Sequence, residues 1–245
     1  MIQTIHAELY RLSHKRSTKI YYGVWIGLFL FVTVVLSTFE SGEQILLEGI
    51  NALQFVSLII SAHAFSAVYC DDFKANTLGN LVSTGKSHAT VVSSKLIVMT
   101  LFTGFVALIH GFIFIGIYLL FGGRFSPYDM KLLQMLVRIG GYTFASIIGF
   151  SAITSVVVYR FKNTALSIVG YILITTGWLN YLFSRFIELF EPLKELSTVT
   201  LSSMLAQIRV GSQEVSPTLF IAVLLLVVLT SSALSTCFLK QSDLS

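Results

Sequence analysis

The chain is organised around residues Tyr69 to Lys95, which read YCDDFKANTLGNLVSTGKSHATVVSSK and form a long hydrophilic interruption between apolar runs. The apolar residues within this stretch recur at the i, i+3, i+4 spacing of one helical face, namely Leu78, Leu81 and Val82. Asn76 and Thr77 are helix-capping residue types, Gly85 supplies a left-handed stop, and Ser87 caps the helix that follows. The pattern predicts a short helix between two membrane spans, with an apolar face that needs a partner.

One motif in this stretch is misleading. The segment Asn80 to Ser87, NLVSTGKS, lacks only the first glycine of the phosphate-binding loop G-x-x-x-x-G-K-[ST]. Such a loop follows a buried strand in a βαβ layer, whereas the residues in front of this segment read FKANTLG. We therefore reject nucleotide binding by this chain and expect it to bind no cofactor.

The composition indicates a polytopic membrane protein. Of the 245 residues, 55% are hydrophobic and only 11% are charged, with a mean hydropathy of +0.82. The net charge of +4 does not indicate nucleic acid as a partner, because the basic residues flank apolar runs. Cys70 and Cys237 both fall at predicted cytosolic ends of spans, so we expect reduced thiols.

Apolar runs of about 20 residues predict six membrane-crossing helices in one transmembrane domain, 1–245. The fold class is therefore all-α, and the expected spans are 20–38, 51–69, 96–121, 133–158, 165–183 and 218–239. Residues 1–19 precede them as an interfacial amphipathic helix, with Ile2, Ile5, Leu9 and Leu12 on one face and Gln3, Glu8, Arg11 and Lys15 around the other. The first apolar run is longer than the core of a signal peptide, so we treat it as an uncleaved span.

The basic residues orient these spans. The 16 Lys and Arg residues divide ten to six between the two sides, and the side with ten holds both termini and residues 70–95. We therefore expect a multi-pass protein with cytosolic termini and a cytosolic loop at 70–95. Residues 184–216 then lie outside as two short amphipathic helices, which could lie on the outer leaflet and whose apolar residues include Phe186, Phe190, Met204 and Ile208.

Residues for chemistry inside the membrane are few. The inner parts of the expected spans contain no Asp or Glu, which disfavours a carrier driven by protons or sodium. His63 and His110 are the deep titratable residues, and each is either a packing residue or part of a transport pathway. Ser151 has no histidine after it, as an intramembrane serine protease would require, and the residue pattern predicts neither a metal site nor an enzyme.

The segment FKANTLGNLVSTGKSH, followed by Lys95, resembles the first cytoplasmic loop of the membrane subunits of type-2 ABC exporters. In that family a short coupling helix in this loop docks on a separate cytosolic ATPase, which binds ATP and Mg. The resemblance implies that docking involves residues Asn76, Thr77, Leu78, Leu81, Val82, Ser83 and Gly85, with a second contact at Arg160 and Phe161. The chain departs from the family at Asn76, where glycine is usual, at Gly79, where a basic residue is common, and at His88, where arginine is usual.

The resemblance implies a permease subunit in the bacterial cytoplasmic membrane, surrounded by lipid and completed by a second copy or a homologous permease. It would export amphipathic or antimicrobial peptides or drugs. The resemblance also implies that residues 184–216 pair as an amphipathic hairpin, in which Phe186, Phe190, Met204 and Ile208 form an extracellular gate. An apolar chain without intramembrane acids suits a cargo that partitions into membranes. The alternatives are an immunity or assembly protein that does not transport, and a standalone intramembrane enzyme.

Overall fold

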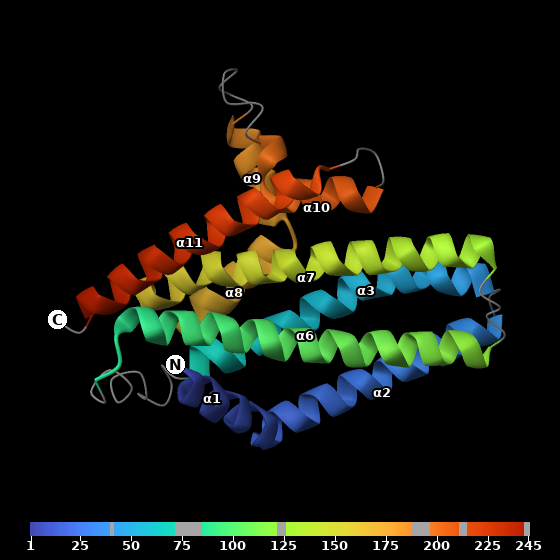
Figure 1. The fold of residues 1–245 in the computed structure, drawn as a ribbon, viewed down its shortest axis with the longest axis horizontal. Helices are drawn as coiled ribbons and strands as arrows, with labels where there is room; N and C mark the ends of the chain where they lie inside the picture. The colour runs from blue at the N-terminus through green and yellow to red at the C-terminus, as the bar shows by residue number, and fades with distance from the viewer. Residues whose placement is uncertain (40–41, 72–84, 122–125, 188–196, 211–214, 243–245) are drawn as a thin grey trace.

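The computed structural model describes residues 1–39, 42–71, 85–121, 126–187, 197–210 and 215–242, and their regular elements are all helices (Figure 1). In chain order these elements are α1 (Ile2–His14), α2 (Arg16–Phe39), α3 (Gly42–Phe65), the π-helical turn η1 (Ser66–Cys70), α6 (His88–Leu120), α7 (Pro127–Phe161), α8 (Thr164–Thr175), α9 (Trp178–Ile187), α10 (Leu201–Val210) and α11 (Pro217–Ser242). The predicted all-α class is confirmed for the described residues.

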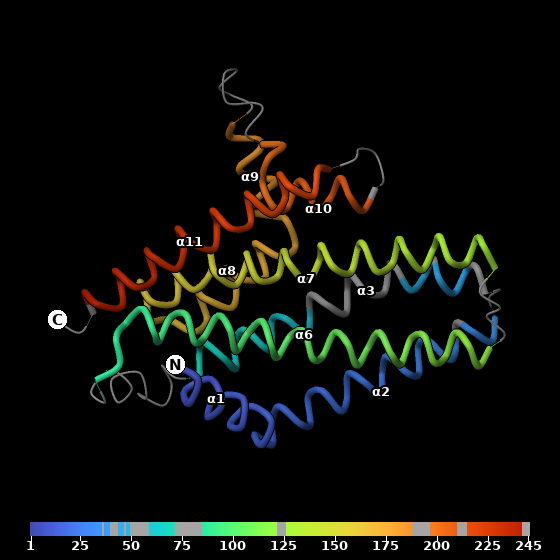
Figure 2. The backbone as a smooth tube through the Cα atoms, viewed as in Figure 1, coloured from blue at the N-terminus to red at the C-terminus, as the bar shows by residue number. Residues whose placement is uncertain are grey.

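The longest helices run side by side along the bundle. Helices α3, α6 and α7 pack together, α2 packs on α6, and α11 crosses α7 and α6 (Figures 1 and 2). Helices α9 and α10 lie beside one end of α11, and α9 projects away from the bundle. The start of α1, the start of α6, the end of α7 and the end of α11 share one end of the molecule.

Four described helices are long and apolar enough to cross a membrane: Arg16–Phe39, His88–Leu120, Pro127–Phe161 and Pro217–Gln241. The bent pair α8 and α9 supplies a fifth crossing if the two helices are taken as one span. Such apolar helices are compatible with hydrocarbon around them, because they satisfy their own backbone hydrogen bonds. The membrane character of the chain is therefore supported, with four or five such helices in the described residues.

The predicted span 165–183 is not one straight helix. Helix α8 ends at Thr175, and α9 begins at Trp178 after a bend of 68°. Gly177 between them has a φ of +81°, a conformation that glycine adopts without strain, and its N–H donates to the carbonyl of Ile174 at 3.1 Å. Helix α9 therefore runs across the predicted boundary between the span 165–183 and the segment 184–216.

Local sequence signals determine where α6 and α7 begin. Gly85 has a φ of +79°, and the Ser87 side chain accepts a hydrogen bond from the N–H of Thr90 at 3.2 Å, which confirms the predicted left-handed glycine and the predicted cap of α6. The helix that Gly85 is predicted to stop lies outside the described residues. At the start of α7, Ser126 and Asp129 form a reciprocal capping box around a proline at the first helical position.

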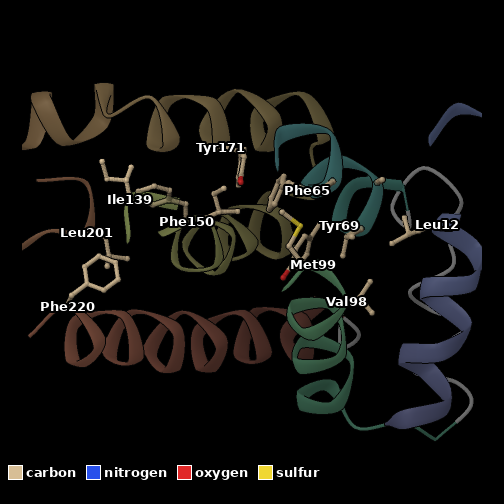
Figure 3. Packing of buried hydrophobic residues seen from close by; sticks show 14 of the residues in the cluster. Leu12, Phe65, Tyr69, Val98, Met99, Ile139, Phe150, Tyr171, Leu201 and Phe220 are labelled. Atoms are coloured by element: carbon tan, nitrogen blue, oxygen red, sulfur yellow. The ribbon is translucent and has the colours of Figure 1, made fainter. Parts of the chain in front are cut away.

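Aromatic rings from four elements fill the interior (Figure 3). Phe65 of α3 stacks on Tyr171 of α8 with ring centroids 4.5 Å apart, and Tyr69 of η1 lies 5.0 Å from Phe65. Phe150 of α7 belongs to the same buried cluster, and all four rings are at most 3% exposed. The broken helix α8 is thus held by packing against α3 and α7 and not by its own length.

Helix α7 has a glycine where α10 and α11 press on it. A Cβ atom at Gly149 would lie 2.5 Å from Leu201 Cδ1 of α10 and 3.1 Å from Leu224 Cδ1 of α11. Farther along the same helix, the hydroxyls of Ser155 and Ser235 lie 2.9 Å apart and link α7 to α11 in the dry interior. Small side chains therefore set how closely these three helices approach.

Gly149→Leu should destabilise the bundle, because the added side chain must displace Leu201 or Leu224. We expect a loss of about 1–3 kcal/mol, the usual effect of overpacking, as a lower melting temperature in detergent. Gly170→Leu is the matched control, because a Cβ atom there meets nothing within 4 Å. Equal melting temperatures for the two variants would contradict close packing at Gly149.

Candidate functional site

The candidate site is the end of the bundle where α1, η1 and the start of α6 meet. It includes the flanks of the predicted docking helix, since the described chain stops at Asp71 and resumes at Gly85. Most of the predicted docking residues lie outside the described residues: Asn76, Thr77, Leu78, Leu81, Val82 and Ser83. The structure therefore describes the helical segments on either side of the loop, while the docking helix stays a prediction.

A buried ion-pair cluster fastens α1 to α6. The Lys95 ammonium lies 3.0 Å from Glu8 Oε1, and the Arg11 guanidinium donates to Glu8 Oε2 at 2.7 Å. The Lys95 side chain is only 1% exposed and that of Glu8 only 11%. A lone charge buried this deeply would be strongly unfavourable, so each of these residues requires its partner.

Arg11 and the residue that caps α1, Lys15, also contact η1 and the residue after it. Arg11 also donates to the backbone carbonyl of Ala67 at 3.1 Å, and Lys15 pairs with Asp71 at 2.5 Å. A π-helical turn departs from the regular i to i−4 ladder and often marks a functional position. Here it lies directly before the loop that carries the predicted docking helix. Helix α1 therefore contacts both segments from which that loop emerges.

Most of the predicted apolar face of α1 contacts the bundle, since Leu12 is buried and Ile5 and Leu9 pack against the core. The inward face of the helix is Thr4, Glu8 and Leu12, each buried, while Ile2 is 82% exposed. The predicted grouping of Glu8 with the polar residues on the other face is therefore wrong. Hydrophobic spacing contains no information that Lys95, 87 residues later, provides a buried cation. The one sequence signal for the burial of Glu8 is its position four residues after Thr4 and four residues before Leu12, on the same helical face.

Electrostatics hold Glu8 in its ionised form. Burial acts to raise the pKa of Glu8, but the charges of Lys95 and Arg11 and their hydrogen bonds outweigh burial and hold the pKa below its ordinary value. The carboxylate therefore stabilises the docked α1 at pH values above the ordinary titration range of glutamate. This contribution is lost as the pH falls through the lowered pKa.

The predicted second contact is exposed at the same end. Phe161, the last residue of α7, is 59% exposed, and Lys162 ends the helix in a left-handed conformation with a φ of 51°. The Arg160 guanidinium lies 5.4 Å from the ring centroid of Phe238 on α11. Phe161 is thus available to a partner, while Arg160 already contacts the last helix.

The two predicted pathway histidines lie apart. The His63 ring stacks on Tyr21 with centroids 3.8 Å apart and meets the edge of Tyr22, which is the geometry of a packing residue. His110 lines a cavity between α6 and α7, and its Nδ1 lies 2.8 Å from the carbonyl oxygen of Val106. In the part of the chain that is described, no cluster of three or more His, Cys, Asp or Glu residues could hold a metal ion.

The predicted gate residues do not share one surface. Met204 and Ile208 of α10 are buried in the main core, at 2% and 6% exposure, and α10 packs on α7. Phe186 of α9 is 61% exposed, and Phe190 lies outside the described residues. Thr200 donates to the side-chain carbonyl of Asn180 at 2.6 Å, which ties the start of α10 to α9. A moving α10 would have to leave the core of the bundle.

Lys95→Met should loosen α1, because Glu8 would keep only Arg11 as a partner. We expect a loss of about 3 kcal/mol, near the lower end for a broken buried pair. The measurement is the labelling rate of a cysteine placed at Thr4, which is 4% exposed, in a background without Cys70 and Cys237. Labelling should accelerate in this variant. In the parent protein, the labelling rate relative to that of the unfolded chain at the same pH should rise as the pH falls through the lowered pKa of Glu8.

Two variants control that experiment. Lys240→Met removes an exposed lysine at the end of α11 and should leave labelling unchanged. Glu8→Gln combined with Lys95→Met removes both buried charges and should label more slowly than Lys95→Met alone. Equal labelling of Lys95→Met and the parent would show that the ion pair does not hold α1.

Comparisons of the chain with protein-family models, with curated proteins and with solved structures gave no significant match.

Proposed function

We propose that this chain is the permease subunit of an ATP-driven exporter, with six spans and cytosolic termini, powered by a separate ATPase. The observation that carries the proposal is that the docking-loop flanks, the α7–α8 turn, the start of α1 and the end of α11 lie together at one end of the bundle (Figure 1). These are the segments that the basic-residue asymmetry assigns to the cytosol. One cytosolic ATPase could contact all of them.

The α1 contacts support a route by which such an ATPase would act. The docking loop joins η1 to α6, and α1 binds both through Arg11 to Ala67, Lys15 to Asp71 and Glu8 to Lys95. A displacement of the loop would therefore reach the buried start of α6 and the end of α3 together. Ion pairs and packed helices transmit such a shift because they rearrange between discrete states and do not deform continuously.

The proposed cargo is an amphipathic or antimicrobial peptide or drug. The expected spans contain no acidic residue with which to bind a hydrated cation. Several outward-facing side chains of α2 and α6 are large and apolar, as suits a protein that handles molecules dissolved in the membrane, and they include Phe31, Phe105 and Phe112. A second copy or a homologous permease would complete the pathway.

Phe161→Asp and Leu81→Asp should each reduce capture of the ATPase when the tagged chain is purified in mild detergent. Each change places an unpaired charge in an apolar contact, and we expect a loss of several kcal/mol. Phe39→Asp is the matched control, because Phe39 is 83% exposed and is the last residue of α2, which ends at the opposite end of the bundle (Figure 1). Undiminished capture by both variants, or an equal loss with Phe39→Asp, would remove the docking assignment.

Cells that express the chain with its ATPase should tolerate more of a membrane-active peptide, and retain less of it, than cells lacking either subunit. The test uses a panel of lantibiotics, bacitracin-like drugs and secreted amphipathic peptides. Tolerance without reduced retention would favour an immunity protein that binds its peptide without transport. No change with any compound would remove peptide export while leaving the docking result intact.

A further inference from the structure

A hollow lies between α6 and α7, away from the ion-pair cluster. It has a volume of about 480 Å³ and opens partly to the surroundings of the bundle. Gly104 and Gly111 of α6 and Gly140 and Gly141 of α7 line it, so missing side chains create much of the space. A Cβ atom at Gly111, Gly140 or Gly141 would meet nothing within 4 Å.

The side chains of the wall are apolar except for those of Thr103 and His110. Leu108, Phe112, Val137 and Phe144 supply hydrocarbon surface, and His110 supplies a ring that is 2% exposed. His110 Nδ1 must donate to the Val106 carbonyl at 2.8 Å, since a carbonyl oxygen only accepts. In the neutral ring this leaves Nε2 as an acceptor, and among the described residues Nε2 has no hydrogen-bond partner.

The volume of the hollow limits which molecules it can hold. An α-helix about 10–12 Å across with a pitch of about 5.4 Å fills roughly 400–600 Å³ per turn, so the space holds about one helical turn. A membrane helix of a second copy would need several turns. A single hydrocarbon chain, by contrast, fits both the volume and the apolar wall, and a volume of this size is within the usual range for small-molecule sites.

The depth of the hollow agrees with a ligand dissolved in the membrane. His110 follows Lys95 by 15 residues on α6, which is about 22 Å along the helix at about 1.5 Å per residue. Lys95 belongs to the predicted cytosolic end, so His110 lies well inside the apolar part of α6. Water would find only one or two polar partners in this wall, and apolar cavities of this kind stay dry.

We propose that this hollow is a binding site for a membrane-dissolved amphiphile with one hydrocarbon chain and a hydroxyl group. The chain lies along Gly104, Gly111 and Gly140, and the hydroxyl donates its hydrogen bond to His110 Nε2. The ligand thereby satisfies the buried acceptor that the protein leaves unpartnered. This proposal stands independently of ATPase docking and of export.

The test uses a long-chain primary alcohol carrying a photoreactive diazirine, and the methyl ether of the same molecule. Purified chain in lipid nanodiscs is irradiated with each probe, and crosslinked peptides are mapped by mass spectrometry. The alcohol should label α6 and α7 around the hollow, about 3–10 times more efficiently than the ether, as one neutral hydrogen bond implies. His110→Leu should remove this preference while the ether still binds.

Gly140→Leu should fill the hollow and reduce labelling by both probes about tenfold, without a clash that would prevent folding. Gly23→Leu on α2 is the control, since a Cβ atom there also meets nothing within 4 Å and Gly23 does not line the hollow. Melting curves of each variant confirm that the bundle is folded. Labelling unchanged by Gly140→Leu, equal labelling by alcohol and ether in the parent, or protein–protein crosslinks across the hollow would each overturn the proposal.

Discussion

A lysine ammonium removed from water is the constraint on which the start of this fold depends. Lys95 is buried on α6, and the Glu8 carboxylate 3.0 Å away is the counter-charge that makes its burial tolerable. Because Glu8 belongs to α1 and also binds Arg11, the amphipathic helix is held at the bundle by charge as well as by its apolar residues. A helix that merely floated on the membrane surface would have no need of a buried acid.

In the second half of the chain, other helices pack around α7. It contacts α3, α8, α10 and α11, and its small residues decide how near they come. Gly149 admits Leu201 and Leu224, while Ser155 accepts or donates a hydrogen bond with Ser235. In a membrane, where apolar surface gains little by leaving lipid, such close approach and internal hydrogen bonding hold helices together. The two halves therefore use different forces at their centres.

Sequence patterns predicted the structural features that depend on neighbouring residues, and they did not predict the features that depend on a residue of another helix. Gly85 and Ser87 were identified correctly because left-handed stops and caps depend on single residue types. The bend at Gly177 was missed, since the apolar run on either side gives the length of a span but not its direction. The inward rotation of Glu8 was also missed, because its cause is a residue on another helix. The docking loop itself, at 72–84, lies outside the described residues.

The π-helical turn at Ser66–Cys70 gives this end of the protein a sensitivity to chain length. A π turn contains one residue more than an α-helical turn, and each residue of an α-helix advances by about 100° around the axis. If the same residues wound as a regular α-helix, Asp71 would be rotated by nearly that angle away from Lys15, with no change in composition. The direction in which the chain leaves α3 is thus encoded as a count of residues as well as by their chemistry.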